Sequence, residues 1–483
     1  MAERFPTQIE VEARERGQVE ASLRLLEGRP LDSLATILHL AVPLILSMGG
    51  LMVMILLNRL FLSWYSQEAV AAIGPAGMTG YLLMSLFIGA ASFSSTMVAQ
   101  YIGAGQPRRA GAAIWQGVYF SLLSGGLVAL CSFLAKPIFT WGNHPPEVCA
   151  LEIVYFRISC WGAPLVILAA ALSGFFSGRG DTRTLMVVQL IGFALNVFLD
   201  YVLIFGKLGF PELGMAGAAW ATVIAEGVLA VVLLALFLMP RYRDQFGTWR
   251  LRFEAPLLAR LIRFGLPNGA RFAIELLAWC FFLFFAGRLG KEEGWATNIA
   301  FTINGFAFFP VVGLSEAIRV LVGHAQGQQR PHLAMRCAWK GLALAELWML
   351  GLAALYFYLP GPLVGMFHDQ RAMSADEFAR LSAMCVALLR FVALYCLLDG
   401  VNITIMGALL GAGDTAWTMV VSVMLHLVFL TALFVLDQIK PDLMIEWAAL
   451  TAFVMVQAFF WLGRFLSGRW RHVQVIERAP ESA

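Results

Sequence analysis

Two acidic residues lie inside apolar stretches of this sequence, where a charge is costly. Glu275 falls within the stretch 261–288, and Asp399 falls within the stretch 383–409. An ionised side chain at the centre of a bilayer costs about 2.5–3.5 kcal/mol on insertion scales, so acids there are rare and usually functional. If the two stretches cross a membrane in opposite directions, both acids lie at similar depth. Such a pair can hold a proton, or a monovalent cation when both are ionised, and we predict that it couples ion movement to another process. The alternative is that each acid only makes a structural hydrogen bond.

Other polar residues are placed to modulate this pair. Tyr395 and Asn402 fall on the same helical face as Asp399, because they lie four residues before it and three residues after it. Arg271 lies four residues before Glu275, and an ion pair between them would favour the ionised carboxylate. Alternatively, Arg271 extends its guanidinium to the inner membrane surface, which we place about one helical turn away. We favour this second interpretation.

A second polar group is expected in the first half of the chain. Asn196 and Asp200 are one helical turn apart in one apolar stretch, and Thr222 and Asn58 fall at comparable depth in two others. Four oxygen-bearing side chains suit a small hard cation or a network that carries a proton. The alternatives for Asp200 are a structural role at a helix end and an ion pair with Arg59.

Aromatic residues gather in the stretch 295–321 and include Trp295, Phe301 and Phe308. Aromatic faces attract organic cations, so these side chains are candidates to line a cavity for a flat cationic compound. Because aromatic residues make up 13% of the whole chain, ordinary packing is the interpretation that we favour for them.

These residues require elements that cross a membrane. Of the 483 residues, 60% are hydrophobic and 13% are charged, whereas a soluble domain is nearer half apolar and a quarter charged. Apolar stretches of about 20 residues or more are typical of transmembrane helices. We predict twelve, at 34–62, 69–98, 112–135, 153–177, 185–206, 214–239, 261–288, 295–321, 338–360, 383–409, 416–436 and 443–466. The seven cysteines include no CxxC pair, so we expect neither a metal site nor a disulfide framework.

Basic residues alternate between the predicted loops. The even-numbered loops hold the larger groups, such as Arg108 and Arg109 in the second loop and six arginines between positions 241 and 263 in the sixth. The odd-numbered loops mostly hold one or two basic residues each. Because positive residues remain on the cytoplasmic side of a membrane, both termini are predicted to be cytoplasmic.

The chain also contains an internal duplication. A fixed offset of 224 relates six pairs of identical residues, namely Pro43 and Pro267, Ala72 and Ala296, Gly89 and Gly313, Gly103 and Gly327, Trp115 and Trp339, and Gly117 and Gly341. After an insertion of nine residues the offset becomes 233. This second offset takes Gly178-x-Gly-Asp-Thr182 to Gly411-x-Gly-Asp-Thr415.

The duplication predicts the architecture. Six helices in each copy make two parallel repeats, which are related by an axis along the membrane normal and enclose a cavity between them. We therefore predict an all-α polytopic membrane protein with twelve transmembrane helices in two six-helix lobes. The predicted parts are a cytoplasmic N-terminal tail (1–33), a first lobe (34–239), a cytoplasmic inter-lobe loop (240–260), a second lobe (261–466) and a cytoplasmic C-terminal tail (467–483).

Five motifs carry a resemblance to a known family. They are SGFFSGRGDTRT (173–184), ALNVFLDYVLIFG (194–206), GMAGAAWATVIAE (214–226), VVGLSEAIRVLVGHAQG (311–327) and MGALLGAGDTAW (406–417). Together they resemble the multidrug and toxic compound extrusion (MATE) family, over nearly all of residues 34–466. The resemblance implies a cation-coupled antiporter whose two lobes form a V in a cytoplasmic membrane. It also implies export of bulky, amphipathic and often cationic organic compounds in exchange for H⁺ or Na⁺.

The resemblance extends to both polar groups. Glu275 and Asp399 match the acids of the family branch that binds its cation in the second lobe. The first-lobe group matches the family's other cation site, at Asn58, Asn196, Asp200 and Thr222. This chain departs from the family at position 58, where the family usually has Asp, and Arg59 is unexpected at the next position. The loss of one carboxylate makes H⁺ the favoured coupling ion over Na⁺.

We therefore predict a transporter rather than an enzyme. It would act as a monomer by alternating access in a bacterial-type inner membrane, with no cofactor and no nucleic-acid partner. Two alternatives remain open, a flippase for lipid-linked sugars and a non-transporting membrane receptor or scaffold. A flippase would favour a wide basic cavity, whereas the predicted membrane interior has few Lys or Arg. A receptor would use a large extramembrane domain, which this sequence lacks.

Overall fold

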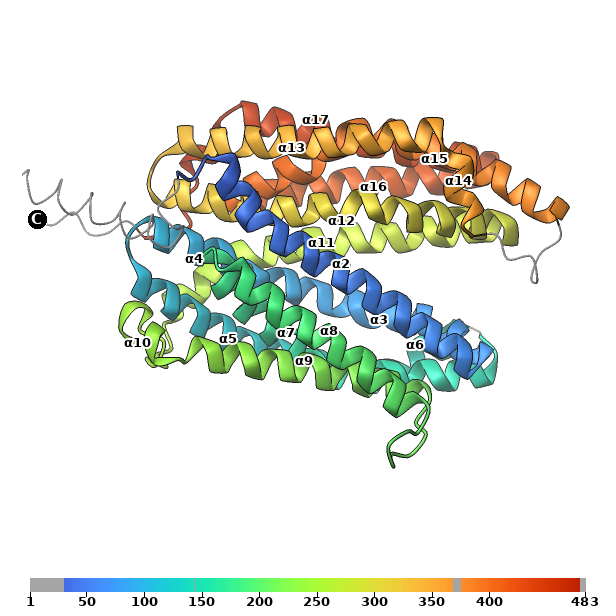
Figure 1. The fold of residues 1–483 in the computed structure, drawn as a ribbon, viewed down its shortest axis with the longest axis horizontal. Helices are drawn as coiled ribbons and strands as arrows, with labels where there is room; N and C mark the ends of the chain where they lie inside the picture. The colour runs from blue at the N-terminus through green and yellow to red at the C-terminus, as the bar shows by residue number, and fades with distance from the viewer. Residues whose placement is uncertain (1–29, 143, 368–374, 478–483) are drawn as a thin grey trace, which may run out of the picture.

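The computed structural model describes residues 30–142, 144–367 and 375–477, which form helices and short connections (Figure 1). The predicted N-terminal tail lies almost entirely outside the described residues. The first half consists of α2 (Leu34–Tyr65), α3 (Gln67–Ser92), α4 (Ser94–Gly103), α5 (Pro107–Leu130), η1 (Cys131–Leu134), α6 (Ala135–Trp141), α7 (Pro146–Gly178), α8 (Thr182–Ile204), α9 (Met215–Phe237) and α10 (Pro240–Phe246). The second half consists of α11 (Ala255–Leu289), α12 (Lys291–Gly327), α13 (Pro331–Tyr358), α14 (Pro360–Gly365), α15 (Ala375–Ala412), α16 (Thr415–Ile439), α17 (Leu443–Leu466) and η2 (Arg469–His472).

The predicted membrane crossings are confirmed. Within the described ranges, twelve helical segments are long and apolar enough to span a membrane, and each overlaps one predicted stretch. Among the helices that begin earlier than predicted are α11 and α13, which start six and seven residues before positions 261 and 338. Both helices have a proline in their first turn. A backbone N–H there has no partner within the helix, so proline costs no hydrogen bond. The apolar stretch therefore underestimates the length of a helix that continues beyond the lipid.

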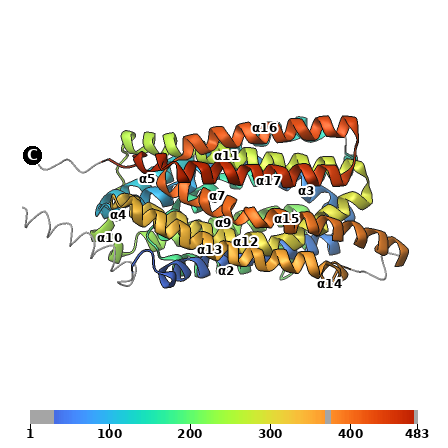
Figure 2. The same cartoon turned by 90° about the horizontal axis from the view of Figure 1, so that it is seen from above.

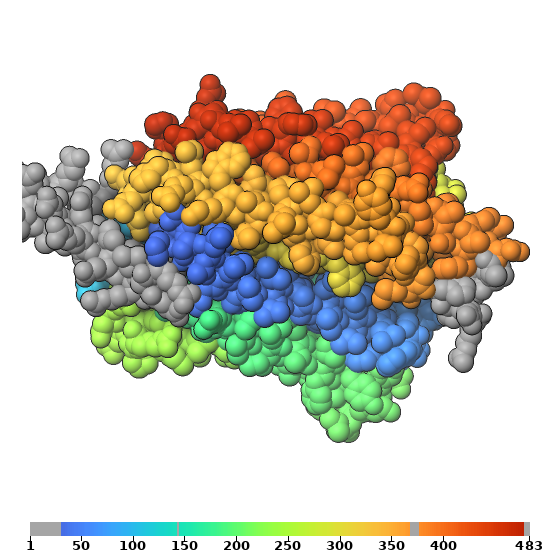
Figure 3. All heavy atoms as spheres, turned by 45° about the horizontal axis from the view of Figure 1, so that its top comes forward, coloured from blue at the N-terminus to red at the C-terminus, as the bar shows by residue number. Residues whose placement is uncertain are grey.

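The two halves of the chain form two lobes that lie side by side. Helices α2 to α9 occupy one side of the molecule and α11 to α17 occupy the other, with most helices close to the long axis (Figures 1 and 2). In the space-filling view the blue and green first half and the yellow to red second half cover separate parts of the surface (Figure 3). The lobes meet mainly where α3 contacts α11 and where α12 contacts α2 and α4.

The contacts between the lobes follow the internal repeat. A Cβ on Gly103 of α4 would overlap the backbone carbonyl of His324, and a Cβ on Gly327 of α12 would overlap the carbonyl of Gln100. Gly103 and Gly327 are separated by 224 residues, and so are Gln100 and His324. The duplication thus recurs as a pair of equivalent contacts, at which only glycine permits the close approach of two helices.

The two Gly-x-Gly-Asp-Thr motifs form tight turns before α8 and α16. Gly180 and Gly413 have φ values of +85° and +90°, a region that favours glycine. Asp181 caps α8 by accepting a hydrogen bond from the Thr184 N–H. Asp414 instead accepts two hydrogen bonds from Arg464 of α17, at 2.6 and 3.1 Å. The aspartate therefore caps a helix in the first copy, whereas in the second copy the equivalent acid fastens α17.

Among the described residues, most ion pairs that involve loops or helix ends lie at one end of the bundle, where α4 and α10 are found (Figure 1). We call it the basic end, after Arg109, Arg179, Arg241, Arg260 and Arg464. Arg109 of α5 donates to Glu254 and to Glu477, each at 2.7 Å, and the Glu477 carboxylate lies 3.4 Å from Arg260 of α11. Glu477, which follows the last helix, therefore bridges the two lobes at this end.

Buried hydrogen bonds also join the lobes near the basic end. Arg319 of α12 is 3% exposed and donates to the Thr96 hydroxyl at 2.9 Å. Gln100 donates to the Gly411 carbonyl at 3.0 Å, and His324 donates to the Gly178 carbonyl at 2.9 Å. These bonds cross from one lobe to the other, so the basic end is closed in this conformation.

Candidate functional site

The four predicted first-lobe residues lie together between α2, α8 and α9. In the amide orientation that satisfies its neighbours, Asn196 donates to Asp200 Oδ2 at 3.0 Å and to Asn58 Oδ1 at 3.2 Å. Its amide oxygen accepts from the Thr222 N–H at 3.2 Å. The arrangement follows from the spacing of one helical turn that places Asn196 and Asp200 on one face of α8. The structure brings the four residues together, and their functional role stays a prediction.

Asp200 is enclosed at the centre of this group. Its side chain is 0% exposed, and its Oδ1 atom has no hydrogen-bond partner among the described residues. Arg59 is exposed, and no ion pair joins it to Asp200 in the described part of the chain. A buried carboxylate that lacks a cationic partner is costly unless it binds a proton or a small cation. The interior of the first lobe therefore offers a site for either.

The second-lobe acid Asp399 is also enclosed. It is 7% exposed, and Asn402 donates to its Oδ1 atom at 3.3 Å. The same amide nitrogen lies 3.1 Å from Gln457 Oε1 of α17, and Tyr395 is buried one turn away on α15. These contacts hold Asp399 between α15 and α17. The predicted polar face of α15 is thus turned into the lobe rather than towards lipid.

Glu275 is paired with an arginine of its own helix. No hydrogen bond joins it to Asp399 in the described structure. Arg271 Nη1 donates to Glu275 Oε2 at 2.6 Å, and the side chain of Glu275 is 47% exposed. The preferred expectation that Arg271 extends to the membrane surface is therefore wrong. The reason is that α11 begins at Ala255, so that sixteen residues, or about 24 Å of helix, precede Arg271.

Replacement of Arg271 by Gln is expected to change the pH dependence of transport and to have little effect on folding. A half-exposed ion pair stabilises a protein by less than about 1 kcal/mol. Loss of the positive charge beside Glu275 should move the midpoint of the transport pH profile by about one unit to higher pH. Arg271→Lys is the control, because it keeps the charge. The same midpoint in the wild type and in both variants, measured as dye export from vesicles, would remove Arg271 from the coupling group.

The predicted aromatic residues are not grouped in one place. Phe301 is packed inside the second lobe, with its ring centroid 4.1 Å from Trp279 and 4.8 Å from Trp447. Trp295 is 45% exposed and lies under the Lys291 ammonium, whereas Phe308 is 36% exposed. The favoured packing interpretation thus describes Phe301 well. Trp295 and Phe308 stay candidates for contact with a compound.

One further acid belongs to the second-lobe group and was missed in the sequence. Glu346 of α13 lies beside Gly400, the residue after Asp399, and its charge interacts with that of Asp399. The signal was present, because Glu346 falls within the apolar stretch 338–360, as Glu275 and Asp399 fall within theirs.

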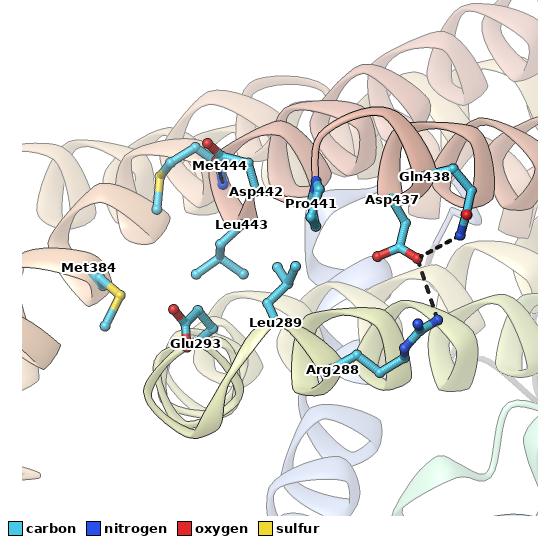
Figure 4. A pocket seen from close by; sticks show the side chains of 10 residues that line it. All are labelled: Arg288, Leu289, Glu293, Met384, Asp437, Gln438, Pro441, Asp442, Leu443 and Met444. Atoms are coloured by element: carbon cyan, nitrogen blue, oxygen red, sulfur yellow. Dashed lines mark hydrogen bonds and ion pairs between the residues drawn. The ribbon is translucent and has the colours of Figure 1, made fainter.

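A cavity of about 670 Å³ lies at the end of the second lobe that is opposite the basic end. Figure 4 shows Arg288 from the end of α11 facing Asp437 from the end of α16, and Glu293 of α12 and Asp442 of the α16–α17 connection also line the cavity. Arg288 Nη1 lies 3.4 Å from Asp437 Oδ2. Since none of the predicted residues lines this cavity, we do not assign it to the candidate site.

Comparison with known proteins agrees with this geometry. The MatE family model matches residues 43–202 and 267–433, and the two matches start at the repeat mates Pro43 and Pro267. A protein described as probable multidrug resistance protein NorM from Thermotoga maritima is 26% identical, over 86% of this chain and 89% of its own length. A protein of the same description from Pseudomonas putida is 29% identical, over 82% of this chain and 86% of its own length.

Solved structures share the fold. A multidrug resistance MATE family transporter in an outward-facing conformation has a TM-score of 0.82 at 20% identity, over 94% of this chain and 99% of that chain. A MOP superfamily transporter from Pyrococcus furiosus has a TM-score of 0.81 at 19% identity, with the same coverage. The twelve helices in two repeated halves and the family model, which matches both halves, lead to one conclusion: this chain is a membrane transporter and a member of the MatE family.

Proposed function

We propose that this transporter exports amphipathic, often cationic, organic compounds across a cytoplasmic membrane, and that entry of H⁺ drives the export. The names of its relatives support the class of compound, since both are described as multidrug resistance proteins. The observation that carries the coupling is the burial of one acid in each lobe. Asp200 and Asp399 are 0% and 7% exposed, and neither forms an ion pair in the described ranges.

The orientation is inferred from the basic end. Basic loops remain on the cytoplasmic side, which places the basic end and both termini there. Because the lobes are joined at that end by Arg319, Gln100 and His324, the present conformation corresponds to an outward-facing state. Opening of the basic end would require these bonds to break. Alternating access then means that the lobes separate at one end while they close at the other.

The coupling cycle follows from the two buried groups. In the outward-facing state a proton binds at Asp399, Glu275 or Asp200. The neutralised acid no longer holds the compound, which then leaves. The inward-facing state loses the proton to the cytoplasm and binds the next compound. Each acid is therefore protonated in one part of the cycle and ionised in the other, when it favours binding of the cationic compound. The transporter is expected to complete this cycle as a monomer.

The choice of H⁺ over Na⁺ rests on Asn58. Asn196 contacts Asn58 and Asp200, so that the first-lobe group contains one carboxylate and three neutral ligands. Na⁺ prefers sites of hard oxygen ligands, and its affinity increases with the number of charged ligands. One carboxylate can bind a proton by itself, whereas a second carboxylate in the group would favour a metal cation.

Asn58→Asp should therefore increase the dependence of export on Na⁺. A second carboxylate within reach of Asp200 adds attraction for a cation, and we expect at least about a fivefold stimulation of export by an inward Na⁺ gradient, near the low end of coupling free energies. Ser63→Asp is the control, because Ser63 lies on α2 but is exposed and bonds only to its own helix in the structure described. An equal Na⁺ response in the wild type and in Asn58→Asp would contradict the role of this position.

The proposed function is tested by reconstitution. Purified protein in lipid vesicles is given a fluorescent organic cation, and a pH gradient and a Na⁺ gradient are imposed separately. We expect dye movement with the pH gradient and little movement with the Na⁺ gradient alone. Movement that is indifferent to both gradients would refute the proposal, and movement driven only by Na⁺ would replace H⁺ as the coupling ion.

A further inference from the structure

The carboxyl group of Glu346 on α13 lies directly on the backbone of α15. A Cβ at Gly400 would be 2.5 Å from Glu346 Oε1, so the acid can occupy this position only because residue 400 is glycine. Gly400 follows Asp399, and the charges of Glu346 and Asp399 interact across the contact between the two helices. The second lobe thus holds two neighbouring acids from two helices, of which Asp399 is buried and Glu346 is half-buried.

No cation balances Glu346 in the described structure. Its Oε1 atom is inaccessible to solvent and has no hydrogen-bond partner there. The titratable groups that interact with it from α15 are Asp399 and Cys396. On the neighbouring helix α12, Arg319 lies 3.3 Å from Glu316. At the end of α13 that contacts α2, Lys340 lies 3.2 Å from Asp32.

The two acids are not a product of the duplication. The offsets of 224 and 233 relate Glu346 to Leu122 and Asp399 to Val166, which are both apolar. The second lobe alone therefore carries this pair.

We propose that Glu346 is a further proton-binding residue of this transporter and that it shares one proton with Asp399. The inference rests on the proposed H⁺ coupling and adds a residue to it. Two neighbouring carboxylates in a medium of low dielectric repel each other, so one proton bound between them is favoured over none. The two acids then bind and release the proton as one unit, and the pH midpoint of transport is a property of the pair.

Two substitutions separate this role from a structural one. Glu346→Gln keeps the shape of the side chain and removes its charge. Gly400→Ala keeps the charge but displaces the carboxyl from its present position, because the added Cβ would meet Glu346 Oε1. In each variant we expect the midpoint of the pH profile of dye export to move by about one unit to lower pH, because a negative neighbour that favours proton binding is lost or displaced.

Matched controls are available on the same lobe. Glu446 is another buried acid, 1% exposed, and it lies near the end of the lobe that is opposite the basic end. Glu446→Gln removes this acid. Gly351→Ala adds a methyl group to the same helix as Glu346, at a position with no atom within 4 Å of the new Cβ. Both controls should keep the midpoint of the wild type. If Glu346→Gln fails to fold, the midpoint of Gly400→Ala alone tests whether Glu346 takes part in proton binding.

The outcomes distinguish this inference from the proposed function. Suppose that the wild type responds to a pH gradient and Asp399→Asn does not, while Glu346→Gln and Gly400→Ala keep the midpoint of the wild type. Glu346 is then only structural, and H⁺ coupling stands without it. A lower unfolding temperature of these two variants with an unchanged midpoint likewise means that Glu346 is only structural. If the wild type itself does not respond to pH, H⁺ coupling fails first.

Discussion

Asp399→Asn is expected to abolish ion-driven export while the protein still folds. Asn fills the space of Asp and can still bond to Asn402, but it cannot exchange a proton. We expect a loss of about 100-fold, which is near the upper end of the 1–3 kcal/mol that couples two ligands in most proteins. The measurement is export of a fluorescent cation from vesicles with an imposed pH gradient, together with the unfolding temperature of the purified variant.

Asp437→Asn is the control for this prediction. The Asp437 side chain is 7% exposed and lies in the same lobe, but it pairs with Arg288 far from Asp399. Its replacement removes a buried charge without touching the proposed coupling group. Normal export in Asp437→Asn and none in Asp399→Asn would support the assignment. Export at the wild-type rate in Asp399→Asn would exclude Asp399 as a coupling residue, whatever the control does.

The second large effect is expected where the lobes meet at the basic end. Gly327→Val and Gly103→Val each place a branched side chain against a backbone carbonyl of the opposite lobe, which cannot move aside as a side chain can. Overpacking of this kind destabilises by about 1–3 kcal/mol. We expect both variants to lower the unfolding temperature and to lose export, because the closed basic end cannot form.

The two glycine variants should resemble each other, since the positions are equivalent in the repeat. Gly351→Val is the control for the helical preference of Val, because a Cβ at position 351 meets no atom within 4 Å. Val forms helix better than Gly by less than about 1 kcal/mol, so we expect the control to keep or slightly gain stability. If Gly103→Val and Gly327→Val export as well as Gly351→Val, the close approach of the lobes at these glycines is not required for transport.

Much of the fold could be predicted, because the lipid environment restricts the choices. Each crossing needs about 20 apolar residues with all backbone groups bonded internally, so the twelve helices followed from composition alone. The duplication was visible because glycines are required wherever two helices approach closely. Gly103 and Gly327 form a matched pair in the sequence, and their contacts across the lobes explain why both are glycine.

The candidate site was only partly predictable. The spacing of Asn196 and Asp200 places them on one face of α8, but no spacing shows that Asn58 of α2 reaches them. The expectation for Arg271 was wrong because hydrophobicity does not reveal where a helix ends outside the lipid, and α11 continues to Ala255. Glu346 was passed over because its neighbour Asp399 is 53 residues away in the chain. Contacts between helices decide the cases of Asn58 and Glu346, and the length of a helix decides that of Arg271.

Proton release on binding of a compound tests the central claim most directly. Purified protein in a weakly buffered solution is mixed with a fluorescent organic cation, and a pH indicator reports the protons that leave. We expect the wild type to release protons as the cation binds, and the double variant Asp200→Asn, Asp399→Asn to release none. Binding of the cation by the wild type with no change in pH would contradict the account, because the buried acids would then not exchange a proton for the compound.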